Sequence, residues 1–164
     1  MKKLSLMILF IVLIVGCTGN IDKRDAINWW NENETVALEI LKLLKSTHLV
    51  KRVEIDTRKE LITNYKNFDD RAWTVYRGVE KIMKNSKLEV ITTHYLDGFF
   101  ILEMIIDRYG YAIGEGGGCY LSVVYYNNAN TYENMIKHVV YSEKLKSNWY
   151  LEINGDKECI RHAK

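Results

Sequence analysis

Residues 111–126 read YAIGEGGGCYLSVVYY, with four glycines around one acidic residue and a cysteine directly after them. A phosphate-binding loop needs Lys and then Ser or Thr after its last glycine, and a dinucleotide fingerprint needs glycine at the sixth position of GxGxxG. Cys119 and Tyr120 occupy those places here. Both motifs also open a helix, whereas a β-branched and aromatic stretch follows. We therefore predict a glycine-rich connection between strands, in which Glu115 and Tyr120 are candidates for a ligand or partner surface.

Cys119 is also a candidate nucleophile for a cysteine hydrolase. In such enzymes a histidine and then a polar orienting residue follow the cysteine, and His138 with Asn148 or Asp156 has this order. An activated thiol usually lies at a helix N-terminus or beside a protonated histidine, but Cys119 begins a predicted strand. The sequence therefore predicts no catalytic residue.

The remaining candidate residues carry weaker signals. Trp29 and Trp30 are candidates for a ligand groove or partner surface, although tryptophans at helical spacing usually belong to the core. Asp69 and Asp70 are better explained as residues of a helix N-terminus than as catalytic acids. No metal or other cofactor is predicted, because the histidines show none of the zinc-motif spacings. These histidines are His48, His94, His138 and His162.

Two stretches that position these residues have the spacing of amphipathic helices. In the first, apolar residues recur at helical spacing over residues 29–44, and Asp25 is the predicted N-cap. In the second, the apolar face covers residues 68–83, and Asn67 is the predicted N-cap. Residues 49–55 alternate apolar and charged residues between the two helices, which predicts a short strand.

From residue 88 onward the pattern changes to strands. Asp97-Gly98 is a two-residue hairpin signal, and it sets Leu96 against Phe99 and Thr92 against Glu103. Both faces of this hairpin are largely apolar, so we expect it to be central in a sheet. Residues 119–126 form a further predicted strand.

A second hairpin signal lies near the end of the chain. Asn154-Gly155 joins WYLEI to DKECI and places Glu152 opposite Lys157, a favourable charge pair. Residues 131–145 fit either a helix or a strand.

The order of these elements predicts an α+β fold, with two N-terminal helices packed on a mostly antiparallel sheet. It is similar to the order in compact rolls such as cystatin-like and nuclear-transport-factor-like folds. No sequence motif selects either family, and a fold alone does not define a function.

The N-terminus carries a more specific pattern. Two lysines precede the apolar run Leu4 to Val15, which is too short to span a bilayer but has the length of a secretory signal core. The run ends in Ile14-Val15-Gly16-Cys17, which resembles the lipobox of bacterial lipoproteins.

This resemblance covers residues 1–17 only. It implies cleavage before Cys17, acyl chains (palmitate among them) on that residue, and anchoring to a membrane of the cell envelope. The family's inner-membrane retention signal is an aspartate at the next position, where this chain has Thr18. The resemblance therefore favours the outer membrane, facing the periplasm or the outside, if the host is Gram-negative, and otherwise the outer face of its single membrane.

The resemblance also bears on domains and on the other cysteines. Residues 1–16 would be the signal, 17–24 a lipidated tether, and 25–164 a single α+β domain. With Cys17 lipidated, Cys119 and Cys159 remain as a pair in an oxidising compartment, so we expect a disulfide between them. It would close a loop of about 41 residues, worth roughly 4 kcal/mol in the chain-entropy model.

The composition narrows the function. Without Lys2 and Lys3 the basic residues equal the 21 acidic residues in number, which argues against a nucleic-acid partner. We predict a non-enzymatic protein-binding module of the cell envelope, such as an immunity protein, an exclusion factor or an assembly accessory. One alternative is a roll that binds a small ligand with its tryptophans and the tyrosines at 120–126. The other is a cell-wall cysteine hydrolase built on Cys119 and His138.

Overall fold

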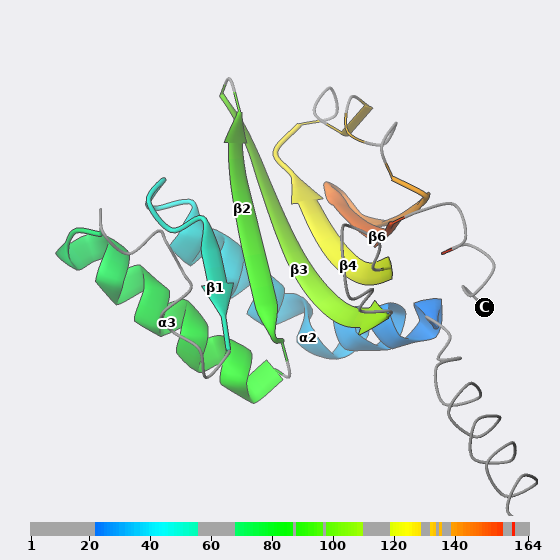
Figure 1. The fold of residues 1–164 in the computed structure, drawn as a ribbon, viewed down its shortest axis with the longest axis horizontal. Helices are drawn as coiled ribbons and strands as arrows, with labels where there is room; N and C mark the ends of the chain where they lie inside the picture. The colour runs from blue at the N-terminus through cyan, green and yellow to red at the C-terminus, as the bar shows by residue number, and fades with distance from the viewer. Residues whose placement is uncertain are drawn as a thin grey trace, which may run out of the picture.

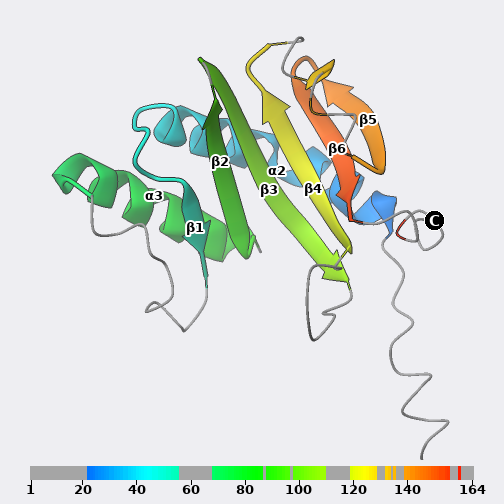
Figure 2. The same cartoon turned by 45° about the horizontal axis from the view of Figure 1, so that its top comes forward.

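The computed structural model describes residues 22–55, 68–86, 88–96, 98–109, 119–128, 132–133, 135, 139–155 and 159. These residues form two helices and one six-stranded sheet, so the α+β class predicted from the sequence is confirmed. Figures 1 and 2 show both helices on the same side of the sheet, with α2 crossing behind its central strands. The elements are α2 (Lys23–Leu44), β1 (Arg52–Glu54), α3 (Asp70–Ser86), β2 (Val90–Leu96), β3 (Phe99–Tyr109), β4 (Cys119–Tyr126), β5 (Tyr141–Lys146) and β6 (Trp149–Asn154).

The sheet is antiparallel throughout, in the order β1-β2-β3-β4-β6-β5. The first predicted hairpin is confirmed residue by residue, with Leu96 paired to Phe99 and Thr92 to Glu103. Gly98 has φ 82°, a conformation that favours glycine and supports the tight turn. The β2–β3 hairpin is central, as its two apolar faces predict.

The second predicted hairpin is wrong. Glu152 pairs with Ser122 of β4 on one side and with Ser142 of β5 on the other. Both edges of β6 are therefore occupied, and no edge remains for a strand containing Lys157, which itself lies outside the described residues. The ambiguous stretch 131–145 contains both predicted states, since Tyr132, Glu133 and Met135 are helical and β5 begins at residue 141.

Both helices begin at other residues than the predicted ones. Asp22 caps α2, and its carboxylate accepts the N–H of Arg24 at 2.9 Å. Asp25 lies instead in the first turn, where its charge suits the positive end of the helix dipole. The α3 cap is Asp69, which accepts the N–H of Ala72 at 2.7 Å. Lys23 and Arg24, the last two residues of the tether predicted for 17–24, lie in α2.

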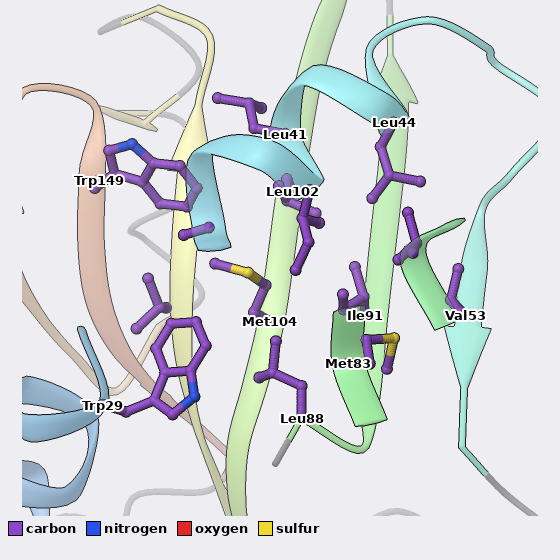
Figure 3. Close-up of a cluster of buried hydrophobic side chains, with 14 of the residues drawn as sticks. Trp29, Leu41, Leu44, Val53, Met83, Leu88, Ile91, Leu102, Met104 and Trp149 are labelled. Atoms are coloured by element: carbon purple, nitrogen blue, oxygen red, sulfur yellow. The ribbon is translucent and has the colours of Figure 1, made fainter. Parts of the chain in front are cut away.

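A single apolar core fills the space between the helices and the sheet. Figure 3 shows Leu41 and Trp29 of α2, Met83 of α3, and Leu102 and Met104 of β3 among the side chains gathered in that layer. The residues of this core recur every three or four positions in the helices and every second position in the strands, so each element turns an apolar face toward it.

Trp29 and Trp30 belong to this core, so the ligand or partner surface suggested for them from the sequence is not formed. Trp29 is 8% exposed and Trp30 5%, and the Trp30 ring lies 5.1 Å from that of Trp149. The Trp29 Nε1–H donates to the carbonyl of Ser86 at 2.9 Å, which joins α2 to the end of α3. Helical spacing placed both rings on the apolar face, and burial of that face is what stabilises the helix.

Candidate functional site

The face of the sheet turned away from the helices carries a small polar cavity. Figure 2 looks onto this face, with β3, β4 and β6 side by side and α2 behind them. The cavity has a volume of about 160 Å³. Its apolar lining comes from Ile101 and Val124 of the sheet and from Met135 and Val139 of the segment between β4 and β5. Its polar lining consists of His94, Glu103, Tyr120, Tyr126, Glu152 and Asn154.

Strand alternation and register bring these polar side chains together. On β4, Tyr120 stands opposite Asn154, Ser122 opposite Glu152, and Val124 opposite Glu103 of β3. Residues directly opposite each other in an antiparallel pair share a face, as do residues two apart in one strand. Glu103 and Glu152 therefore lie on the two strands that flank β4, on the same face of the sheet. Their partners on β4, Val124 and Ser122, are two positions apart, and the cavity lies between the two glutamates.

Glu152 is almost completely buried, with 2% of its surface exposed. Burial raises its pKa to about 7; the hydrogen bond from Tyr126 opposes this rise, and the charge of Glu103 adds to it. The Tyr126 hydroxyl donates to Glu152 Oε1 at 2.8 Å. A carboxyl group with a pKa near 7 changes charge in the physiological range, which exposed glutamates do not.

Glu103 is half-buried and faces the same cavity. The Thr92 hydroxyl donates to its Oε2 at 3.2 Å, and the Asn154 side-chain amide donates to its Oε1 at 3.3 Å. Burial raises the pKa of Glu103, while hydrogen bonds from Ser122 and Thr92 and the nearby His94 act in the opposite direction. The two carboxyls are thus held by neutral donors, and each disfavours the charge of the other.

Tyrosines complete the site. Burial and the charges of Glu103 and Glu152 raise the pKa of Tyr120 to about 12, and the same causes raise the pKa of Tyr126. Both hydroxyls therefore stay protonated at neutral pH. Tyr132 stacks on Tyr150 with 3.9 Å between ring centroids and makes an edge contact with Tyr126, so Tyr132 is held against the sheet.

A second hollow of about 350 Å³ lies where the C-terminus of α2 meets the β2–β3 hairpin. Lys45 is its cation, but its Nζ already lies over the Tyr125 ring and donates to the Tyr125 hydroxyl at 3.0 Å. The Tyr95 hydroxyl lies 2.8 Å from the Leu44 carbonyl and 2.9 Å from that of Thr47, at the otherwise unpaired end of α2. These polar groups are used within the fold, so the hollow is a weaker candidate for a site.

The site residues predicted from the sequence do not come together in one site. Cys119 and Cys159 form the expected disulfide, with Cα atoms 5.6 Å apart. This bond leaves no Cys119 thiol for the hydrolase alternative. Tyr120 lines the cavity, whereas Cys17 and Glu115 lie outside the described residues.

Sequence reasoning missed the two glutamates of the site. The available signal was an acidic residue inside each of two apolar strands, FFILEMIID and WYLEI, whose neighbouring residues predict burial. Glu103 and Glu152 occupy positions of this kind, but both had a cross-strand partner that accounted for them, Thr92 in one case and the mistaken Lys157 in the other.

The described part of the chain shows neither metal-site geometry nor a membrane-spanning helix. No group of three or more His, Cys, Asp or Glu side chains there is arranged to hold a metal ion. Among those same residues, no helix combines the length and apolarity that crossing a bilayer requires. None of the protein-family models, curated proteins or solved structures compared with this chain matches it. The case for a function therefore depends on the residues and their geometry.

Proposed function

We propose that this protein is a cell-envelope lipoprotein, anchored by lipid on Cys17, whose globular domain binds another protein of the envelope without catalysing a reaction. The observation that carries the proposal is the Cys119–Cys159 disulfide. Disulfides persist in oxidising compartments outside the cytoplasm, which agrees with a secretory signal. The bond also accounts for two of the three cysteines and leaves Cys17 within the lipobox-like sequence.

Stable anchoring needs two or more acyl chains, because one chain binds a membrane only marginally. The lipobox resemblance implies lipid on both the thiol and the new amino group of Cys17. Immunity, exclusion and envelope-assembly roles all require a small anchored domain with a partner in reach. An outer-membrane location in a Gram-negative host belongs to this proposal.

Two measurements test it together. The intact mass of the protein purified from membranes should show a chain that begins at Cys17 with added lipid, and Cys17→Ser should abolish both the processing and the membrane fraction. Crosslinking in the cell followed by affinity purification should then capture one envelope protein reproducibly with the wild type and much less of it with Cys17→Ser. A wild-type chain without lipid would refute the anchor. An anchored chain that captures no partner would refute the protein-binding function.

The second candidate function is small-ligand binding, and the cavity between Glu103 and Glu152 favours it. In this reading the domain is roll-like: the helices cover one face of the sheet, and Met135 and Val139 help to enclose a pocket on the other. The ligand groove is then formed by Tyr120 and Tyr126 rather than by the tryptophans. Thermal unfolding in the presence of cell-wall fragments and lipids tests it, since a ligand of the native state must raise the Tm.

A further inference from the structure

The cavity on the helix-free face holds two carboxyl groups and no basic partner among its described lining residues except the exposed His94. The other hydrogen-bond donors to these carboxyls are neutral: Thr92, Ser122 and Asn154 for Glu103, and Tyr126, Ser142 and Asn154 for Glu152. Burying a carboxylate without a cation beside it is unfavourable in free energy. Such a group therefore either keeps its proton or is stabilised when a positively charged group binds next to it. The cavity provides the space in which such a charge fits.

The size and lining of the cavity define the shape of this group. Its volume of about 160 Å³ matches the cavities of about 150 Å³ that accommodate a benzene molecule, which corresponds to roughly six heavy atoms. Ile101, Val124, Met135 and Val139 provide apolar contacts for a hydrocarbon stem. The tyrosine rings add faces on which a cation is favourable. A short aliphatic stem with a positively charged head satisfies every part of this lining.

We infer that the cavity between Glu103 and Glu152 binds a primary ammonium group on a short aliphatic stem. The group comes either from a lysine side chain of the partner protein or from a free alkylamine, and both present the same chemistry to the site. The inference deepens the proposed binding function by naming what the domain recognises. It does not depend on the lipid at Cys17.

An ammonium group fits better than the other cations. Calcium takes six to eight oxygen ligands, most of them charged or from the backbone, and only two carboxylates meet here. A guanidinium is always charged and carries a rigid planar fork of five donors, whereas the carboxyls stand on opposite sides of β4. An ammonium has three rotatable donors, so one group can donate to carboxyls that line a cavity from different sides, as Glu103 and Glu152 do here.

Binding should be coupled to release of a proton. Glu152 must ionise to receive the ammonium, so affinity is expected to rise as the pH increases from 6 to 8. Burial raises the pKa of Tyr120 and of Tyr126, so both hydroxyls stay protonated over this range. The groups from the neighbouring elements are His94 of β2, Glu103 of β3, Tyr120 and Tyr126 of β4, and Tyr132 of the covering segment.

The test is calorimetric titration of the full chain, purified in detergent, at pH 8. Three probes are compared: Nα-acetyl-lysine methylamide, the norleucine analogue that lacks the ammonium, and propylamine. The lysine probe should bind at least roughly tenfold more tightly than the norleucine probe, because charge-assisted hydrogen bonds contribute about 1.5–3 kcal/mol each. Equal affinity of propylamine and the lysine probe would assign a free amine, and tighter binding of the lysine probe would assign a partner lysine.

Matched variants identify the site. Glu152→Gln and Glu103→Gln keep the size of each side chain and should each weaken the lysine probe roughly tenfold or more. Glu143→Gln removes the same charge from an exposed position on β5 and should leave affinity within about twofold. Norleucine binding as tightly as lysine, full affinity in Glu152→Gln, tighter binding of an arginine analogue, or no lysine binding at pH 8 would each overturn the inference. If a Gln variant does not fold, the rise in wild-type affinity between pH 6 and pH 8 decides the question.

These failures are separable from those of the proposed function. Loss of lysine and amine binding with a partner still captured at the membrane would remove the ammonium site alone. Ammonium binding without lipid or a captured partner would leave the site standing and refute the envelope module.

Discussion

Glu152→Gln should make the protein more stable, and the gain should depend on pH. In the folded state the pKa of Glu152 lies at about 7, whereas its ordinary value is 4.5. Because the folded state holds the proton more tightly, the contribution of Glu152 is most favourable below pH 4.5 and is lost as the pH rises through about 7. At pH 8 the wild type has lost roughly 3 kcal/mol of folding free energy in this way.

Glutamine has the shape of glutamate and no charge to desolvate. Its amide oxygen can accept the hydrogen bond from Tyr126, which the structure places at 2.8 Å from the carboxylate. The difference in unfolding free energy between Glu152→Gln and wild type should therefore grow by roughly 2–3 kcal/mol between pH 5 and pH 8. The raised pKa of Glu103 leaves a weaker dependence of the same sign in the variant.

Urea denaturation at pH 5 and pH 8 measures this difference. With a typical urea dependence for a small domain, the change corresponds to about 1–2 M in the difference between the two midpoints. Glu143→Gln, at an exposed position, provides the control and should show no such change. The explanation is wrong if the midpoint difference between variant and wild type is the same at both pH values. It is also wrong if that difference favours the variant less at pH 8 than at pH 5.

Three further substitutions test the framework that holds the site. Removing the disulfide with Cys159→Ser should lower the unfolding free energy by about 4 kcal/mol in urea titrations, whereas Cys17→Ser should leave it unchanged. Trp29→Phe deletes the buried donor to the Ser86 carbonyl and should cost about 1–3 kcal/mol, measured as a lower thermal midpoint; an unchanged midpoint would mean that this bond contributes nothing. Asp69→Ala removes the cap of α3 and should cost about 1 kcal/mol, with loss of helical circular dichroism on mild heating, and equal melting of variant and wild type would contradict the cap.

The elements with long, regular patterns were predictable from the sequence. The β2–β3 hairpin was fixed to the residue, because Asp97-Gly98 selects a two-residue turn and a one-residue slip would turn every side chain to the opposite face. The second hairpin failed because Asn154-Gly155 carries the same local signal. There the competing turn at Ser147 and Asn148, where Ser147 has φ 46°, pairs β5 with β6 instead. Serine is an uncommon residue at positive φ, so this turn has almost no sequence signal.

The N-caps of the two helices were also not predictable from the local sequence. Asp22, Asp25 and Asp69 are all residue types that cap helices, and the local sequence does not distinguish a cap from an acid in the first turn. The site was harder still. Glu103 and Glu152 lie 49 positions apart in the chain by their numbers, on strands that are not neighbours, so only the order β3-β4-β6 brings them to one cavity.

The unfavourable free energy of burying Glu103 and Glu152 indicates where the function of the protein lies. Replacing buried charged groups by apolar residues of similar volume is often neutral or stabilising, so the fold has no need of a carboxyl at either position. Positions that break a local rule without a structural gain are the expected locations of function. By contrast, Leu102, Met104 and Leu151 on the helix-covered face are apolar and fully buried. Among the described residues, Glu152 is the one charged side chain that is buried.

The proposed anchor limits what this cavity can meet. Between Cys17 and the cap at Asp22 the chain spans at most roughly 17 Å when fully extended. The start of α2 therefore has to stay near the membrane surface, and Lys23 there lies over the Tyr141 ring at the beginning of β5. A lipid-anchored domain held this closely cannot reach a partner across the periplasm. A lysine of a protein at the same membrane lies within its reach, so a search for a protein partner should start there.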